Sequence, residues 1–134
     1  MTDYSTEDYS NYRLQRAKET ILEVEKHLEN KFWNTAINRM YYACFYAVGA
    51  LLIKHNIKTS THKGAREKFG QFFVKTGKID RYMAKHYTDL FDKRSKGDYT
   101  DFFDYDGETA TNLLPTTKQF IKRIEVLIIE GKTV

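Results

Sequence analysis

Three short clusters hold the residues in this sequence that are best suited to chemistry. The first, residues 38–43, reads Asn-Arg-Met-Tyr-Tyr-Ala and places Arg39 and Tyr42 within a strongly apolar segment. An unpaired guanidinium is costly to bury, so Arg39 requires either an acidic partner or a polar groove. Both alternatives stay open here: an internal ion pair that fixes helix packing, or a groove lined by Arg39 and Tyr42.

The second cluster, residues 58–64, reads Lys-Thr-Ser-Thr-His-Lys-Gly and leads into the start of a helix. Free backbone N–H groups at a helix N-terminus favour a bound anion. Lys58, His62 and Lys63 would add positive charge or hydrogen-bond donors to such a site. The alternative interpretation is an ordinary helix cap with exposed side chains.

The third cluster combines Arg94 with Asp98 and Tyr99. Arg94 continues the apolar stripe of Tyr87 and Leu90, so we expect it on the inward face of its helix. A charge in that position either serves a ligand or pairs with a carboxylate. Asp98 is the nearest carboxylate that fits the second interpretation.

Several common types of catalytic or cofactor site are missing. The sequence has no glycine-rich phosphate loop, no paired-cysteine metal motif and no Gly-x-Ser-x-Gly turn. The four histidines, at positions 27, 55, 62 and 86, have no second His or Cys at metal-ligand spacing. We therefore expect no metal site and no cofactor.

Apolar residues recur with helical spacing in five segments, and no strand-like alternation stands out. The first helix begins at Ser5, which together with Asp8 resembles a capping box. The second runs from about Phe32 to Ile53 and is apolar on most sides, which is typical of a central, buried helix.

The third helix is predicted to follow an N-cap at Ser60 or Thr61, and Gly77 is its expected C-cap. One face of this helix carries the residues predicted to be buried, namely Ala65, Phe69, Phe72 and Thr76.

The fourth helix is expected to end near Arg94, and the polar, acidic and aromatic segment 95–106 is typical of a loop. The fifth helix contains Pro115, which lacks a backbone donor and predicts a kink or a restart. Five helices with short connections predict an all-α, up-and-down bundle that forms one domain over residues 1–134.

The composition favours an ordinary intracellular helical protein. The chain has 134 residues, 22 basic and 18 acidic side chains and a formal net charge of +4, which permits nucleic-acid binding without requiring it. The single cysteine, Cys44, is expected to be a small buried side chain. The acidic, polar N-terminus is unlike a signal peptide, and the longest apolar stretch, about 40–53, is shorter than the ~20 residues of a membrane span. We expect a cytoplasmic protein without membrane contact.

The three clusters, in this order, resemble the HEPN superfamily, and more narrowly its branch of small stand-alone proteins. Residues 38–45 read Asn-Arg-Met-Tyr-Tyr-Ala-Cys-Phe, similar to the Asn/Ala-Arg-x-Tyr-Tyr-Ala-x-Phe run of that branch. Thr-His-Lys-Gly at 61–64 and Phe-Phe-Val-Lys-Thr-Gly at 72–77 follow, and then Arg94 with the Asp-Tyr pair at 98–99. The likeness extends over roughly residues 8–128.

This resemblance implies a helical bundle that often forms homodimers, with the Arg-containing motif near the dimer cleft. Many HEPN proteins are metal-independent ribonucleases, and others bind RNA or a protein partner. Several work with a minimal nucleotidyltransferase that acts as an antitoxin and can AMPylate a Tyr near the motif, which makes Tyr99 a possible target. In the ribonuclease version, a His follows the Arg within a few residues and transfers protons, while the Arg stabilises the charge on phosphorus.

The sequence departs from the ribonuclease motif after Arg94. Positions 95–101 read Ser-Lys-Gly-Asp-Tyr-Thr-Asp and contain no His. A solvated aspartate is a poor proton donor near pH 7, so Asp98 is a weak substitute. His62 replaces the missing group only if the fold brings it near Arg94.

The leading hypothesis is therefore a HEPN module that binds RNA, a nucleotide or a minimal nucleotidyltransferase in a toxin–antitoxin or defence system, without ordinary ribonuclease activity. In it Arg94, Arg39 and His62 contact phosphate, Asp98 orients Arg94, and aromatic side chains stack or form hydrogen bonds. Those aromatic candidates are Tyr42 and Tyr99, and the other cationic candidates are Lys58 and Lys63. One alternative is a metal-independent endoribonuclease that uses Arg94 with His62 or Tyr99 as catalytic residues. Another is a purely structural interaction protein.

Overall fold

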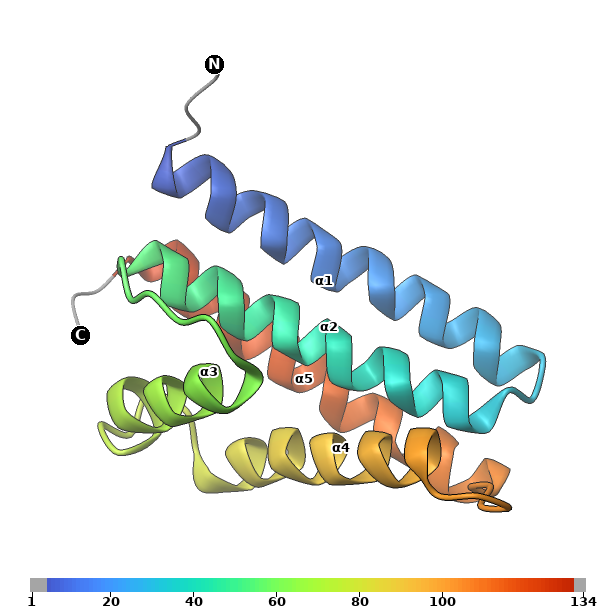
Figure 1. Ribbon diagram of the computed structural model, residues 1–134. Helices are drawn as coiled ribbons and strands as arrows, with labels where there is room; N and C mark the ends of the chain where they lie inside the picture. The colour runs from blue at the N-terminus through green and yellow to red at the C-terminus, as the bar shows by residue number, and fades with distance from the viewer. Residues whose placement is uncertain (1–4, 132–134) are drawn as a thin grey trace.

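The computed structural model describes residues 5–131, and within this range the chain is helical without strands. Figure 1 shows the elongated bundle that the helices form. The predicted all-helical class and the five helices are confirmed. In chain order the elements are α1 (Thr6–Glu29), α2 (Trp33–Lys54), α3 (His62–Phe69), the π-helical segment η1 (Gly70–Val74), α4 (Arg81–Tyr99) and α5 (Gly107–Glu130).

Helix α2 is the centre of the bundle and contacts each of the other α-helices (Figure 1). Side chains on several of its faces are fully buried, including Ile37, Met40, Cys44 and Leu51. By length and composition α2 resembles a membrane span, but 61% of its most apolar window is buried against the other helices. This burial is what a core helix of a helical bundle requires.

Side-chain caps fix the starts of α1, α3, α4 and α5. Ser5 Oγ accepts a hydrogen bond of 3.0 Å from the backbone N–H of Asp8, and Thr61 Oγ1 accepts one of 2.8 Å from Gly64. Each such cap stabilises a helix by about 1 kcal/mol because it satisfies a backbone donor that lacks a partner within the helix. The predicted helix starts at Ser5 and Thr61 are confirmed.

The predicted end of the fourth helix is wrong, because α4 continues past Arg94 to Tyr99. Asn34 of α2 holds the chain that follows: its side-chain amide donates to the carbonyl of Phe103 at 3.0 Å and accepts from the N–H of Tyr105 at 2.8 Å. Tertiary contacts therefore extend a helix that local composition would end.

Three further local predictions need correction. Phe73 is buried in place of Phe72, and Thr76 is exposed, because the chain leaves α-helical geometry at η1. Gly77 has a left-handed φ of 81° but lies in the turn after the helix, where its N–H donates to the carbonyl of Val74. Finally, of the two alternatives predicted for Pro115, the restart is wrong, because α5 continues through this residue.

Candidate functional site

Arg94, near the end of α4, lies over a group of aromatic rings. The centre of its guanidinium is 5.2 Å from the ring centroid of Tyr41, and 5.5 Å from those of Tyr42 and Phe91. The side chain is only 11% exposed, and its buried Nε has no hydrogen-bond acceptor. Cation–π contacts of this kind hold a guanidinium in place without neutralising its charge.

Asp98 lies one helical turn after Arg94 but is held mainly by another residue. Its Oδ2 accepts a 2.8 Å hydrogen bond from the amide of Asn38, whereas the Nη1 of Arg94 is 3.9 Å from the same oxygen. The Tyr99 hydroxyl lies 3.5 Å from Arg94 Nη1 and the Tyr99 side chain is largely exposed. The pairing of Arg94 with Asp98 is therefore loose and leaves the arginine available to an anion.

Arg39 makes no ion pair with any residue in the range 5–131. Its guanidinium lies 4.8 Å from the centroid of the Tyr42 ring, and its Nε donates to Asn38 Oδ1 at 3.0 Å. The side chain is partly exposed. Of the two predicted alternatives, this geometry matches a polar surface lined by Arg39 and Tyr42, not an internal ion pair.

His62, the first residue of α3, contacts the same two tyrosines as Arg94. Its ring stacks on Phe45 at 4.1 Å and lies 5.7 Å from the Tyr41 ring and 5.8 Å from the Tyr42 ring. Its Nδ1 is 2.6 Å from the Tyr41 hydroxyl. The fold thus brings together His62 and Arg94, which are far apart in the sequence.

Burial and nearby charges determine the protonation states of His62 and Tyr41. Burial, together with the charges of Arg94 and Arg66, lowers the pKa of His62 below its usual 6.5. Burial raises the pKa of Tyr41 to about 12, so its phenol stays protonated. A neutral imidazole and a protonated phenol are best paired when Tyr41 O–H donates to Nδ1, which leaves the His62 proton on Nε2.

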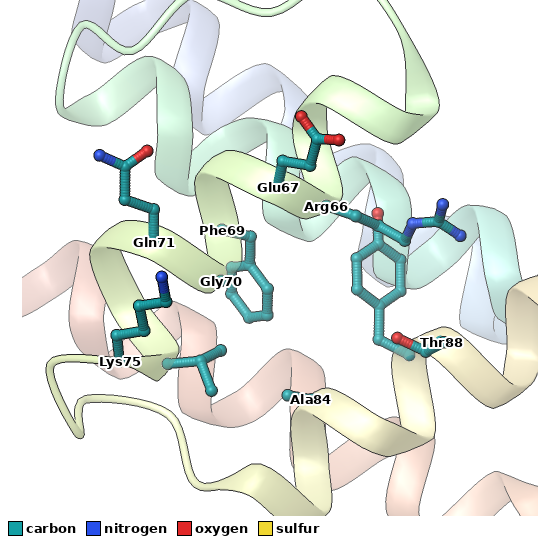
Figure 2. Close-up of a pocket in the computed structure, with 10 residues that line it drawn as sticks. Arg66, Glu67, Phe69, Gly70, Gln71, Lys75, Ala84 and Thr88 are labelled. Atoms are coloured by element: carbon teal, nitrogen blue, oxygen red, sulfur yellow. The ribbon is translucent and has the colours of Figure 1, made fainter.

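Arg66, which the sequence analysis did not single out, adds a third guanidinium. It lies 4.3 Å from the centroid of Phe91, the ring that also supports Arg94. Arg66 lines a hollow of about 620 Å³ between η1 and α4, and Figure 2 shows it on the same side of this hollow as Thr88, opposite Gln71 and Lys75. The positive surface around Arg94 therefore continues towards this hollow.

The two lysines of the second predicted cluster lie elsewhere. Lys63 is exposed and lies 3.9 Å from Glu67, and the α3 N-terminus is already capped by Thr61. Lys58 lies on a groove against α1. Of that cluster, only His62 joins the group around Arg94.

We define the Arg94 cluster as the side chains that meet at and around the rings of Tyr41, Tyr42 and Phe91. It presents three guanidiniums and one carboxylate, together with tyrosine rings and one neutral imidazole. Such a surplus of positive charge beside aromatic faces suits a phosphate group and a stacked base. No group of three potential metal ligands occurs within the described residues. The members are Asn38, Arg39, Tyr41, Tyr42, His62, Arg66, Phe91, Arg94, Asp98 and Tyr99.

Sequence patterns missed the roles of Tyr41, Asn38 and Arg66. Tyr41 looked like a core residue because it belongs to the apolar stripe of α2, and it is fully buried. Its hydroxyl nevertheless contacts His62, and its ring lies under Arg94. The run at 38–45 was the available signal for Tyr41 and Asn38, while nothing in the sequence distinguished Arg66 from other surface arginines.

Known proteins agree with this architecture. A HEPN domain model matches residues 10–127. A UPF0332 protein of Thermotoga maritima is 35% identical over 121 residues, which cover 90% of this chain and 92% of that protein. A Methanocaldococcus jannaschii protein named as a putative toxin is 30% identical over 117 residues, 87% of each chain. The predicted resemblance is confirmed, and the chain belongs to the HEPN domain family.

Proposed function

We propose that this protein is a toxin-type HEPN module that binds RNA through the Arg94 cluster and lacks ordinary HEPN ribonuclease activity. The observation that carries the proposal is the state of Arg94. Its guanidinium is fixed on aromatic rings, its Nε has no acceptor, and its nearest carboxylate is 3.9 Å away and bound to Asn38. A fixed, incompletely paired arginine is prepared to bind a phosphate oxygen.

Three further features support RNA as the ligand. The exposed ring of Tyr99 beside Arg94 offers a face on which a base can stack. Arg39 and Arg66 extend the positive surface on either side. Two relatives are named as putative toxins, which supports the toxin-type part of the proposal. The segment after Arg94 lacks the His of the ribonuclease motif, which supports the absence of ordinary ribonuclease activity.

Binding of a fluorescent, unstructured oligoribonucleotide in EDTA tests this function. Wild-type protein is expected to bind in a salt-dependent manner, because each phosphate contact releases counterions. Arg94→Ala should weaken binding, while Arg81→Ala, which removes an exposed arginine at the other end of α4, should not. Loss of thermal stability in Arg94→Ala with unchanged RNA affinity would instead support a purely structural role.

A metal-independent endoribonuclease is the second candidate, favoured by the contact of His62 and Arg94 with the same two tyrosines. In that reaction the 2′-hydroxyl attacks phosphorus, the 5′-oxygen leaves, and a cyclic phosphate forms. For this reaction His62 would take the other tautomer, in which Nδ1–H donates to the Tyr41 hydroxyl. Its free Nε2 would accept the 2′-hydroxyl proton and return it to the leaving oxygen, while Arg94 would stabilise the charge on phosphorus.

Cleavage of the same RNA in EDTA separates the two candidates. If the protein is an enzyme, Arg94→Ala and His62→Ala should each abolish cleavage while the helical content and melting temperature are retained. Full cleavage by both variants would identify a contaminating nuclease. Binding without cleavage is the outcome that our proposal predicts.

The resemblance also suggests a minimal nucleotidyltransferase partner and a homodimer, and the composition suggests a cytoplasmic location, as parts of this proposal. Tyr99 is 76% exposed beside Arg94, so its hydroxyl is accessible to an AMP-transferring partner. Intact-mass spectrometry of protein from its native host should then detect an AMP adduct that Tyr99→Phe lacks. An adduct on another residue would contradict this assignment, and light scattering of the purified protein would test the dimer.

A further inference from the structure

A second arginine, Arg13 of α1, has the same unusual environment as Arg94. Its guanidinium lies 5.5 Å from the ring centroid of Tyr9 and 5.9 Å from that of Tyr46. Its Nη2 donates to the Tyr9 hydroxyl at 3.2 Å, and its buried Nε has no acceptor. Within residues 5–131, Arg13 and Arg94 are the two arginines with a buried, unsatisfied Nε, and Arg13 has no carboxylate partner.

Arg13 lines a groove of about 460 Å³, which lies between α1, α2 and the segment that leads to α3. This volume falls in the range of small-ligand sites. Lys58 adds a second positive charge, and no acidic side chain is among the described residues that line the groove. We call this feature the Arg13 groove; its polar and aromatic lining includes Tyr9, Arg13, Phe45, Asn56, Lys58 and Thr59.

Two routes of direct contact connect the Arg13 groove to the Arg94 cluster. Phe45 lines the groove and stacks on His62. Tyr46, under Arg13, lies 6.1 Å from Tyr42, the ring that supports Arg94. The two sites are therefore neighbours, joined through Phe45 and through the pair of Tyr46 and Tyr42.

We propose that the Arg13 groove is a second RNA subsite, in which Arg13 and Lys58 bind the backbone phosphates of a single strand that also occupies the Arg94 cluster. This inference rests on the proposed function. Single-stranded RNA is the occupant that fits best, because its binding sites alternate cationic side chains with aromatic faces along a continuous track. An acidic protein segment would use the charges but not the aromatic rings that lie beside them, of which Tyr9 and Tyr99 are exposed.

Ligand length provides the test. We would compare a dinucleotide, which fills one site, with a longer oligouridylate, which reaches both, using fluorescence anisotropy. Arg13→Ala should weaken oligouridylate binding about tenfold. It should also reduce the slope of log affinity against log salt by the amount expected for the loss of about one phosphate contact. The same variant should leave dinucleotide binding at the Arg94 cluster unchanged. Arg94→Ala should weaken both ligands, and Arg81→Ala is the matched control.

Other outcomes separate this inference from the proposed function. If wild-type protein binds neither ligand, the proposed function fails. If Arg94→Ala behaves as expected but Arg13→Ala matches Arg81→Ala, only the second subsite is wrong. A change in oligomeric mass in Arg13→Ala without a change in RNA affinity would identify the groove as a protein interface and overturn the inference. Should Arg13→Ala unfold, Lys58→Ala provides the same length comparison at an exposed residue, and equal effects on both ligands would contradict the subsite.

Discussion

The Arg94 cluster and the Arg13 groove each hold an arginine on tyrosine rings, but they differ in what surrounds the charge. Arg94 has a carboxylate at 3.9 Å and shares two rings with the titratable His62. Arg13 has neither a carboxylate partner among the described residues nor a histidine on its two rings. The comparison indicates that the net charge of the Arg94 cluster depends on the protonation of His62 and on the carboxylate of Asp98. The charge of the Arg13 groove, in contrast, does not change with pH near neutrality.

The largest expected effect is the loss of RNA affinity in Arg94→Ala. A hydrogen bond to a charged group contributes about 1.5–3 kcal/mol, so affinity for a dinucleotide should fall roughly 10- to 100-fold. Arg94→Lys should recover only part of this loss, because lysine lacks the planar group that stacks on Tyr41 and binds phosphate through two N–H groups. Isothermal titration calorimetry of wild type, Arg94→Ala and Arg94→Lys measures the dinucleotide affinity. Equal affinities in all three proteins would mean that the dinucleotide does not bind at Arg94.

Asn34→Ala should disturb the Arg94 cluster and leave the Arg13 groove intact. Asn34 fixes the segment after α4 through backbone hydrogen bonds to Phe103 and Tyr105, so its removal should lower the free energy of unfolding by about 1–3 kcal/mol. The end of α4 that carries Arg94 should lose order, which weakens dinucleotide binding. The effect of Arg13→Ala on oligouridylate should persist in this background. Urea unfolding measures the free energy of unfolding, and fluorescence anisotropy measures the affinities for the dinucleotide and the oligouridylate.

Lower pH should strengthen the Arg94 cluster alone. Because the folded protein depresses the pKa of His62, the imidazole is neutral at pH 7 and gains a proton as the pH falls below 6.5. The new charge should tighten dinucleotide binding several-fold once the pH falls below the lowered pKa of His62, a change of about 1 kcal/mol, and His62→Gln should abolish this change. An equal pH response in His62→Gln would assign the effect to another group.

The same depressed pKa has the opposite effect on stability. The unfolded chain takes up the proton more readily, so the stability present above pH 6.5 decreases as the pH falls through the folded-state pKa. His86, buried between α4 and α5 with its Nε2 2.8 Å from Thr117 Oγ1, also has a lowered pKa and should contribute in the same direction. Thermal melts of wild type and His62→Gln at pH 5 and pH 7 isolate the contribution of His62, because His86 and His55, whose pKa is lowered by burial and two nearby lysines, titrate in both proteins.

The smallest expected effect is a gain of affinity in Asp98→Asn. This variant keeps a side chain that can bond to Asn38 but removes the one carboxylate of the cluster. A loosely paired surface charge contributes at most about 1 kcal/mol, so dinucleotide affinity should rise up to about fivefold. Titration at low salt would detect the gain. A loss of affinity would mean that the charge of Asp98 orients Arg94, as the sequence analysis expected.

Much of the helical framework was predictable because it depends on local chemistry. The caps at Ser5 and Thr61 and the apolar faces of α1, α2 and α5 are readable from spacing alone. The end of α4 was not predictable, because Asn34 stabilises it from a distant part of the chain. The burial of Phe73 depends on the π-helical geometry of η1, which no local pattern indicated.

The candidate site was predictable in most of its components but not in its assembly. Residue type and motif identified six side chains that the structure brings together, namely Arg39, Tyr42, His62, Arg94, Asp98 and Tyr99. The contact of His62 with the rings under Arg94 depends on how α3 packs on α2, which sequence spacing does not encode. Arg13 has no motif at all, and only the packing of α1 on α2 places it on Tyr46.

The most direct test of the central claim is the affinity of the wild-type protein and of Arg94→Ala for one labelled oligoribonucleotide across a range of salt concentrations in EDTA. We predict that wild-type affinity falls with salt. Arg94→Ala should bind at least about tenfold more weakly, and the slope of its log affinity against log salt should be smaller by about 0.7, the value for one phosphate contact on a single strand. Identical curves for the two proteins, with Arg81→Ala as the control, would contradict a phosphate-binding role for Arg94.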